Sequence, residues 1–188
     1  KNIKKDVGNL DFVVHALAYS DKEELKGKYV ETSRKNFLST LDISTYSFTR
    51  VARHASKIMK NGGSFLTLTY VGSNKTTPNY NVMGIAKAAL ETSVKYLSVD
   101  LGKNNIRVNA ISAGPMKTLA GAAISGARHV YRYSEKIAPL QKNPDLKQVG
   151  KAALYLLSDI SSGVTGLTHY VDGGLKIVGI PNQELINI

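Results

Sequence analysis

Tyr70, Tyr80 and Lys87 are the side chains of this sequence whose types and spacing best fit catalysis. Tyr70 ends a strand-like run, Ser64–Tyr70, and Tyr80 opens a helix-like run. Tyr80 and Lys87 are seven positions apart, which on an α-helix is about 700° of turn, so both project from nearly one face roughly 10 Å apart. An ammonium near a phenol can lower the pKa of the phenol or hold a sugar hydroxyl between the two groups. The pattern predicts a site for proton transfer or oxyanion stabilisation.

The composition fits one soluble globular domain and excludes several kinds of site. The chain has 188 residues, 43% of them hydrophobic, and no cysteine, which rules out disulfides, thiolate nucleophiles and cysteine-bound metals. The histidines are too scattered for a metal site; we interpret His15 as a core residue and His54 and His169 as structural. No apolar stretch approaches the roughly 20 residues that span a bilayer, and Lys1–Leu10 does not resemble a signal peptide. We therefore expect a cytoplasmic protein with no metal and no membrane contact.

The net charge of +11 suggests a negatively charged partner. Nucleic acid and an acidic protein are both candidates, and a basic surface that is merely solvated is the third interpretation. Lysine and arginine are spread along the chain, and no zinc-finger, homeodomain or RNA-binding signature is present. The favoured prediction includes no nucleic acid, although a non-catalytic basic binding protein stays an alternative.

Runs typical of strands alternate with runs typical of helices along the whole chain. The predicted strands are Leu10–Ala18, Ser64–Tyr70, Ile106–Ile111 and Leu167–Val171, and the predicted helices are Ser33–Lys60, Tyr80–Lys103 and Asp145–Ser158. Loops are expected at Val71–Asn79 and Ser112–Thr118, a turn at Asp172-Gly173-Gly174, and the least regular structure at Leu119–Gln141. The alternation predicts an α/β fold, a Rossmann-like doubly wound parallel sheet, and one domain over residues 1–188.

One part of a dinucleotide-binding sheet has no counterpart in the sequence. Such a sheet opens with a strand, a glycine-rich turn and a helix whose N-terminus receives the pyrophosphate. Lys1–Gly8 instead resembles the end of a helix, and a buried strand follows it directly. We expect the N-terminal strands and the glycine-rich loop to be absent from this chain, which would then be the C-terminal part of a longer protein and inactive alone.

Three motifs, in order, resemble the bacterial enoyl-acyl-carrier-protein reductases, divergent members of the short-chain dehydrogenase/reductase superfamily. The first is LTLTYVGSNKTTPNYNVMGIAK at Leu66–Lys87, with the seven-residue spacing of tyrosine and lysine that this family has and a second tyrosine ten positions earlier. The others are RVNAISAGPMKTLA at Arg107–Ala120 and HYVDGG at His169–Gly174. The similarity extends to about Gly179, nearly the whole chain.

The resemblance implies reduction of the 2,3-double bond of an enoyl thioester carried on acyl carrier protein, the last step of fatty-acid elongation. NADH would supply the hydride, with NADPH as the alternative. Tyr80 would donate a hydrogen bond to the thioester oxygen, and Lys87 would hold the nicotinamide ribose. Tyr70 would line the pocket beside the substrate, either as a proton source or as part of the wall alone. A superfamily enzyme acting on a carbonyl or alcohol is the competing function, and a non-catalytic fragment is another.

Further residues and partners follow from the same resemblance. It implies cofactor contacts from Ala16, Leu17, Lys87, Met116 and Thr118, and substrate contacts from Tyr19, Tyr70, Tyr80 and Ala120, with substrate-binding helices at about 118–140. Arg128, Arg132 and Lys136 recur every four residues and would form a basic stripe, either a solvated face or a docking surface for acyl carrier protein. The two long helices would form the interface of a homotetramer.

Overall fold

The computed structural model describes residues 5–118, 121 and 124–186. Its sheet has four parallel strands in the order of the sequence: β1 (Phe12–His15), β2 (Gly63–Thr69), β3 (Ile106–Ala113) and β4 (Thr168–Val171). Each of the first three strands is followed by a crossover that returns the chain to the same end of the sheet, so all carboxyl ends lie at one edge. This edge is where an open α/β sheet binds its ligands.

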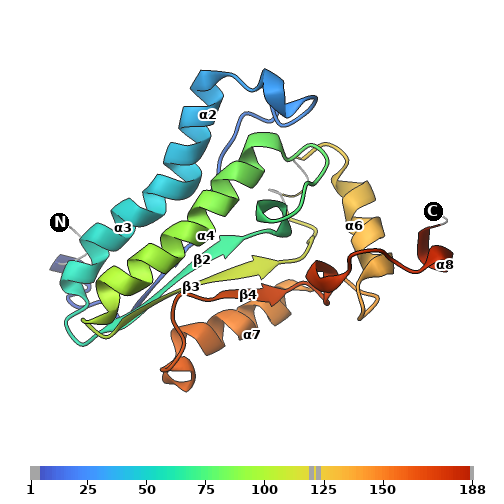
Figure 1. Cartoon of the computed structure of the whole chain (residues 1–188). Coiled ribbons are helices and arrows are strands. Elements are labelled where there is room, and N and C mark those ends of the chain that lie inside the picture. Colours follow the sequence, from blue (N-terminus) through green and yellow to red (C-terminus); the bar gives the residue numbers. More distant parts are fainter. Residues whose placement is uncertain (1–4, 119–120, 122–123, 187–188) are drawn as a thin grey trace.

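Helices cover both faces of the sheet (Figure 1). On one face lie α2 (Arg34–Leu41), α3 (Ser47–Ala55) and the long α4 (Asn81–Gly102), and on the other lies α7 (Leu146–Leu157). Beyond the carboxyl ends of the strands stands α6 (Ala127–Ile137). The short elements are η1 (Tyr29–Glu31), the π-helical η2 (Asp42–Tyr46), η3 (Ser56–Ile58), η4 (Val71–Ser73), η5 (Asp159–Ser161), η6 (Leu175–Ile177) and α8 (Gln183–Ile186). The layers confirm the predicted α/β, Rossmann-like parallel fold.

Two apolar cores form because side chains alternate between the faces of each strand. Phe65 and Val108 point to the α3 and α4 side, where they pack with Phe48, Leu90 and Val94. On the other side, α7 contributes the residues that pack on the sheet. The strongly apolar inner face of α4 therefore fixes this helix over β2 and β3.

Strand β1 is shorter and more exposed than the predicted strand Leu10–Ala18. Only Phe12–His15 pairs with β2, and Phe12 and Val14 are half exposed, at 54% and 48%. These two side chains point to the face that α7 covers, but α7 packs mainly against β2, β3 and β4. The sequence predicted a buried strand here, and β1 is only partly buried.

The predicted helix Ser33–Lys60 is helical almost throughout but not uniform. A π-helical turn, η2, separates α2 from α3 and places the Thr45 hydroxyl 2.8 Å from the Ala86 carbonyl of α4, to which it donates. Such single turns accommodate one extra residue within a helix. Here the turn joins α2 and α3 to α4 next to Lys87.

Three other boundaries differ from the sequence-based prediction. β3 extends to Ala113 because Ser112 and Ala113 pair with β4, so these two residues are not in a loop. A 3-10 turn, η4, lies in the predicted loop Val71–Asn79. Within the segment expected to be least regular, α6 is a regular helix.

In the described part of the chain, no helix is both long and apolar enough to cross a membrane.

Candidate active site

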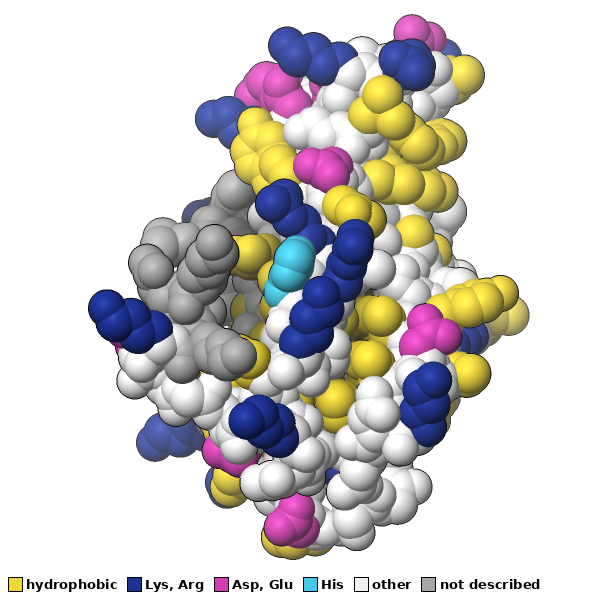
Figure 2. All heavy atoms as spheres, turned by 90° about the vertical axis from the view of Figure 1, so that its left-hand side faces the viewer, with side chains coloured by type: hydrophobic (Ala, Val, Ile, Leu, Met, Phe, Trp, Pro, Cys, Tyr) yellow, Lys and Arg dark blue, Asp and Glu magenta, His cyan; other side chains and the backbone are white. Residues whose placement is uncertain are grey.

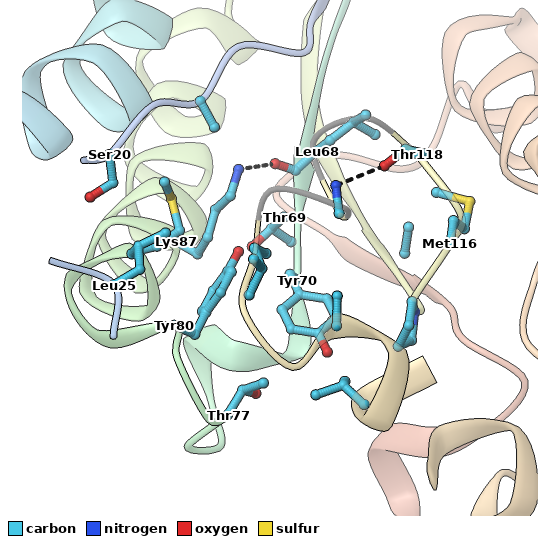
Figure 3. Close-up of a pocket in the computed structure, with 18 of the residues that line it drawn as sticks. Ser20, Leu25, Leu68, Thr69, Tyr70, Thr77, Tyr80, Lys87, Met116 and Thr118 are labelled. Atoms are coloured by element: carbon cyan, nitrogen blue, oxygen red, sulfur yellow. Dashed lines mark hydrogen bonds between the residues drawn. The ribbon is translucent and has the colours of Figure 1, made fainter. Parts of the chain in front are cut away.

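Lys87 projects from α4 into the carboxyl edge of the sheet and is buried, with 7% of its surface exposed. Its ammonium donates a hydrogen bond of 2.8 Å to the Leu68 carbonyl of β2 (Figure 3). Burial lowers the pKa of Lys87 to about 8, and the nearby Glu91 carboxylate acts in the opposite direction. Lys87 can therefore change its charge within the range of pH in which most enzymes work.

Tyr80 occupies the N-cap position of α4. Its ring packs against the backbone of a glycine, Gly72. A Cβ on Gly72 would lie 2.6 Å from the Tyr80 ring, and a Cβ on Gly84 would lie 2.8 Å from the Gly72 carbonyl oxygen. The residues on either side, Asn79 and Asn81, have positive φ angles of 57° and 24°. Glycine at 72 and 84, together with this unusual turn, allows the ring to lie inside the pocket.

Tyr70 follows β2 directly and meets the Tyr80 ring edge-on, with 5.2 Å between the ring centroids and an interplanar angle of 65°. Figure 3 shows the Tyr80 hydroxyl on the side of Lys87, whereas the Tyr70 hydroxyl points the other way. Burial raises the pKa of Tyr70, and a hydrogen bond with the Thr77 side chain offsets part of this increase. The two phenols thus face different parts of the same cavity.

The pKa of Tyr80 bears on the two roles that the sequence left open for Lys87. Burial raises the pKa of Tyr80 well above its usual value, and the proximity of Tyr70 adds to the increase. This direction favours an ammonium that holds a sugar hydroxyl over one that lowers the pKa of the phenol. A phenol in this state keeps its proton and acts as a hydrogen-bond donor.

A cavity of about 720 Å³ surrounds these groups, a size typical of small-molecule sites. Tyr19, Tyr70, Tyr80, Lys87, Met116 and Thr118 line it, so the structure brings together six of the residues singled out from the sequence. Ala16 and Leu17 follow β1 but do not line the cavity, and both are exposed. Ala120 lies outside the described residues.

Sequence reasoning missed other residues of the cavity wall: Ser20, Asp21, Leu25, Met83, Ile124, Ala127, Val130 and Tyr131. The spacing of Ala127, Val130 and Tyr131 is that of one helix face and could have indicated this wall. No local pattern marks Ser20 and Asp21, because contacts with Asn36 of α2 hold them in place.

The cavity offers donors suited to a cofactor that carries sugar hydroxyls. An ammonium has three N–H donors, and within the described residues the Leu68 carbonyl takes one of those of Lys87. Lys87 lines the cavity, and Figure 3 shows the Tyr80 hydroxyl pointing to the same side as its ammonium, so two donors are left for a bound group. Among the described residues, no three His, Asp or Glu side chains gather as a metal ion would require.

Two polar residues near this edge are structural, as predicted. His15 is buried and forms hydrogen bonds with Ser47 and Thr67, at 2.8 and 3.3 Å. Burial, and to a lesser degree the charge of Lys87, lowers the pKa of His15. The Asp172 carboxylate accepts hydrogen bonds from the amides of Gly174 and Lys176, at 2.9 Å each, and so shapes the turn after β4.

Comparison with known proteins gives consistent matches. The family described as enoyl-(acyl carrier protein) reductase matches residues 1–176. Enoyl-[acyl-carrier-protein] reductase [NADH] 1 of Rhizobium meliloti strain 1021 is 60% identical over 92% of this chain, and the match covers 64% of that protein. Enoyl-[acyl-carrier-protein] reductase [NADPH] FabI of Staphylococcus aureus strain MRSA252 is 52% identical over 95% of this chain and 70% of its own length.

Solved structures agree with the sequence relatives. The reductase of Anaplasma phagocytophilum, a crystal structure in complex with NAD, superposes with a TM-score of 0.93 at 56% identity, over 96% of this chain and 69% of that chain. The chain thus spans about two thirds of the length of the relatives that it matches. With a family match over residues 1–176 and this degree of identity, the chain belongs to the enoyl-(acyl carrier protein) reductase family.

Proposed function

We propose that this protein reduces the 2,3-double bond of enoyl thioesters carried on acyl carrier protein, using NADH, with NADPH as the alternative donor. The observation that carries the proposal is the convergence of Tyr80 and Lys87 in one cavity at the carboxyl edge of the sheet. The names of the relatives support the reaction, and both nicotinamide donors occur in those names.

Tyr80 would act on the oxygen of the thioester. When hydride from the bound nicotinamide adds to the β-carbon, the electron pair of the double bond moves toward the thioester carbonyl, and its oxygen gains negative charge. A protonated phenol that is itself buried stabilises this charge by a hydrogen bond that strengthens as the charge grows. The raised pKa of Tyr80 supports the role of donor. The α-carbon then takes up a proton to complete the product.

Lys87 would orient the cofactor rather than transfer a proton to the substrate. Its ammonium lies beside the Tyr80 hydroxyl, with donors available for ribose hydroxyls. A cation fixed in the cavity would hold the cofactor in one orientation relative to the thioester. Restricting two reactants to one geometry lowers the entropic part of the barrier. Tyr70 would line the substrate side of the cavity.

The basic stripe on α6, formed by Arg128, Arg132 and Lys136, is our proposed docking surface for acyl carrier protein. All three residues are exposed, and the opposite face of α6 contributes Val130 and Tyr131 to the cavity wall. Glu135 is also exposed on this helix, and its negative charge offsets part of the positive charge of the stripe. A positive helix at the entrance would guide an acidic carrier toward the site by complementary charge.

We also propose a cytoplasmic homotetramer whose subunits meet through α2, α3 and α4. Figure 2 shows apolar side chains on the face seen from the α3 side, between small groups of Lys and Arg. On α4, Tyr96 and Val99 are 72% and 79% exposed, and Tyr46 of η2 is 53% exposed. Large exposed apolar side chains on neighbouring helices are typical of an interface between subunits. Cell fractionation tests the location.

The first prediction concerns the two groups at the centre of the site. Tyr80→Phe should lower kcat with crotonyl-coenzyme A about 100-fold or more, because it removes one oxyanion donor. Lys87→Ala should raise the KM for NADH about tenfold or more, because it removes charged hydrogen bonds to the cofactor. Oxidation of NADH measures both effects in a protein that joins this chain to the N-terminal strands and glycine-rich loop of a relative, and Tyr96→Phe, an exposed tyrosine of the same helix, is the control. Unchanged turnover by both variants, or faster turnover of ketones than of enoyl thioesters, would contradict the proposal.

The second prediction is a pH dependence of cofactor binding. Since the pKa of Lys87 is lowered to about 8, the ammonium loses its proton as the pH rises through that value. The Kd for NADH should be nearly constant below about pH 7 and rise by up to about tenfold per pH unit above the pKa. Tyr80 keeps its proton across this range because its pKa is raised. Fluorescence titration measures the dependence of the Kd on pH. Lys87→Arg should make the Kd independent of pH in this range. A Kd that does not change with pH in the unaltered protein would refute the prediction.

The third prediction tests the docking surface on α6. Arg128→Glu combined with Arg132→Glu should raise the KM for an enoyl thioester on acyl carrier protein about tenfold or more, because attraction becomes repulsion. The KM for the coenzyme A thioester should change less than about twofold, since this substrate does not need the carrier surface. Lys147→Glu combined with Lys151→Glu on α7, also exposed, is the matched control. Equal losses with both substrates would argue against docking.

The fourth prediction concerns assembly. Val99→Asp on α4 should convert the tetramer to smaller species, because a charge would be buried at the interface without a partner. Val30→Asp on η1 is the control, since Val30 and Val99 are 80% and 79% exposed. Light scattering gives the mass in solution. A monomeric unaltered protein, or a tetramer that survives Val99→Asp, would exclude this interface.

A further inference from the structure

Glu91 is a partly buried carboxylate of α4 that the proposed reaction does not use. It stands four residues, about one helical turn, after Lys87. Its Oε1 accepts hydrogen bonds from the Thr69 hydroxyl, at 2.7 Å, and from the Ser73 hydroxyl. Its Oε2 accepts one from the Asn74 side-chain amide, at 3.2 Å. One carboxylate thus gathers three donors from outside its own helix.

These donors come from both sides of Tyr70. Thr69 precedes it at the end of β2, and Ser73 and Asn74 follow it in and after η4. Hydrogen bonds to an ionised acceptor are about twice as strong as those between neutral groups. Together with the bond from Lys87 to the Leu68 carbonyl, they fasten residues 68–74 to α4 at two neighbouring points.

The same segment controls the position of the Tyr80 ring. Gly72 of η4 packs so closely that a Cβ there would lie 2.6 Å from the ring, and the Tyr70 ring contacts it edge-on. A shift of η4 would therefore move the surface against which Tyr80 rests. Since catalytic groups must be held within a fraction of an ångström, the groups that support them matter for the rate.

Glu91 is also the negative charge that acts on Lys87. Among the described residues, the other titratable groups on this side are His15 from β1 and the phenol of Tyr80 at the start of α4, which Tyr70 in turn contacts. His15 and the phenols are neutral near pH 8, because the pKa of His15 is lowered and those of the phenols are raised. Glu91 thus offsets part of the cost of burying the ammonium.

We propose that Glu91 is a positioning residue of the active site, which holds the segment around Tyr70 in place and keeps the ammonium of Lys87 charged. The inference rests on the proposed function for the role of Lys87 in cofactor binding. A simple structural tie between η4 and α4 would contribute to stability alone. The two roles are separable because one depends on the charge of Glu91 and the other on its hydrogen bonds. Glu91→Gln keeps an oxygen for Thr69 and Ser73 and loses the bond from Asn74, since an amide nitrogen cannot accept, so Ser73→Ala isolates the hydrogen-bond role.

Two substitutions separate these roles. Glu91→Gln removes the charge at nearly constant shape, so the pH at which NADH binding weakens should fall by about half a unit to one unit. At pH 8.5 this corresponds to a rise in Kd of about three- to tenfold. Ser73→Ala removes one donor and keeps the charge, so the pH profile should stay in place. Its kcat should fall about tenfold as η4 loosens.

Fluorescence titration with NADH from pH 6 to 9.5 measures the first effect. Hydrogen exchange measures the second without any turnover, at the amides of Ser73, Asn74 and Lys75, which donate to carbonyls of Tyr70 and Val71. These amides should exchange faster in Ser73→Ala. Asp100→Asn, an exposed charge change on the same helix, should alter neither measurement.

The outcomes distinguish the inference from the proposed function. If Glu91→Gln binds NADH with the profile of Asp100→Asn, Glu91 does not keep Lys87 charged. If the amides of Ser73→Ala exchange as in the unaltered protein, the network does not hold the segment. If these variants lower only the melting temperature, the network contributes to stability and Glu91 is not a positioning residue. NADH binding is measured on the chain joined to the N-terminal strands and glycine-rich loop of a relative. If that protein does not bind NADH, the proposed function fails, and the exchange rates still decide whether the network holds the segment.

Discussion

The contact between α4 and the carboxyl end of β2 determines where the site lies. Leu90 and Val94 of α4 are fully buried against the sheet together with Phe65 of β2. This packing brings the ammonium of Lys87 to the Leu68 carbonyl, and the hydrogen bond between them fixes the helix along the strand. The positions of the Tyr70 and Tyr80 rings follow from this register, because Tyr70 comes directly after β2 and Tyr80 directly before α4.

The sequence was informative where local chemistry and local structure coincide. The seven-residue spacing placed Tyr80 and Lys87 on one side of α4, and the structure brings both into the cavity. The apolar runs located β2, β3 and β4 to within two residues, because buried parallel strands read as continuous hydrophobic segments. β1 was placed less well, since half of its side chains lie beyond the helices that cover the sheet.

What the sequence could not predict depends on contacts between distant segments. Ser20 and Asp21 reach the cavity because Asn36 of α2 holds them, over a separation of about 15 residues. Glu91 would read as an ordinary helix carboxylate, and only the packing of η4 against α4 shows its three donors. The direction of the pKa shift of Tyr80 likewise depends on burial, which spacing does not contain.

Burying Lys87 creates an electrostatic problem that the fold solves locally. A fully desolvated ammonium would lose its proton, and the lowered pKa near 8 shows how close this one comes to doing so. The Leu68 carbonyl and the Glu91 carboxylate oppose that loss, from β2 and from α4 itself. The phenols experience the same burial but are neutral in their protonated form, so desolvation strengthens their role as donors. Burial in one cavity thus favours a protonated phenol unaided and a protonated amine only with the support of Leu68 and Glu91.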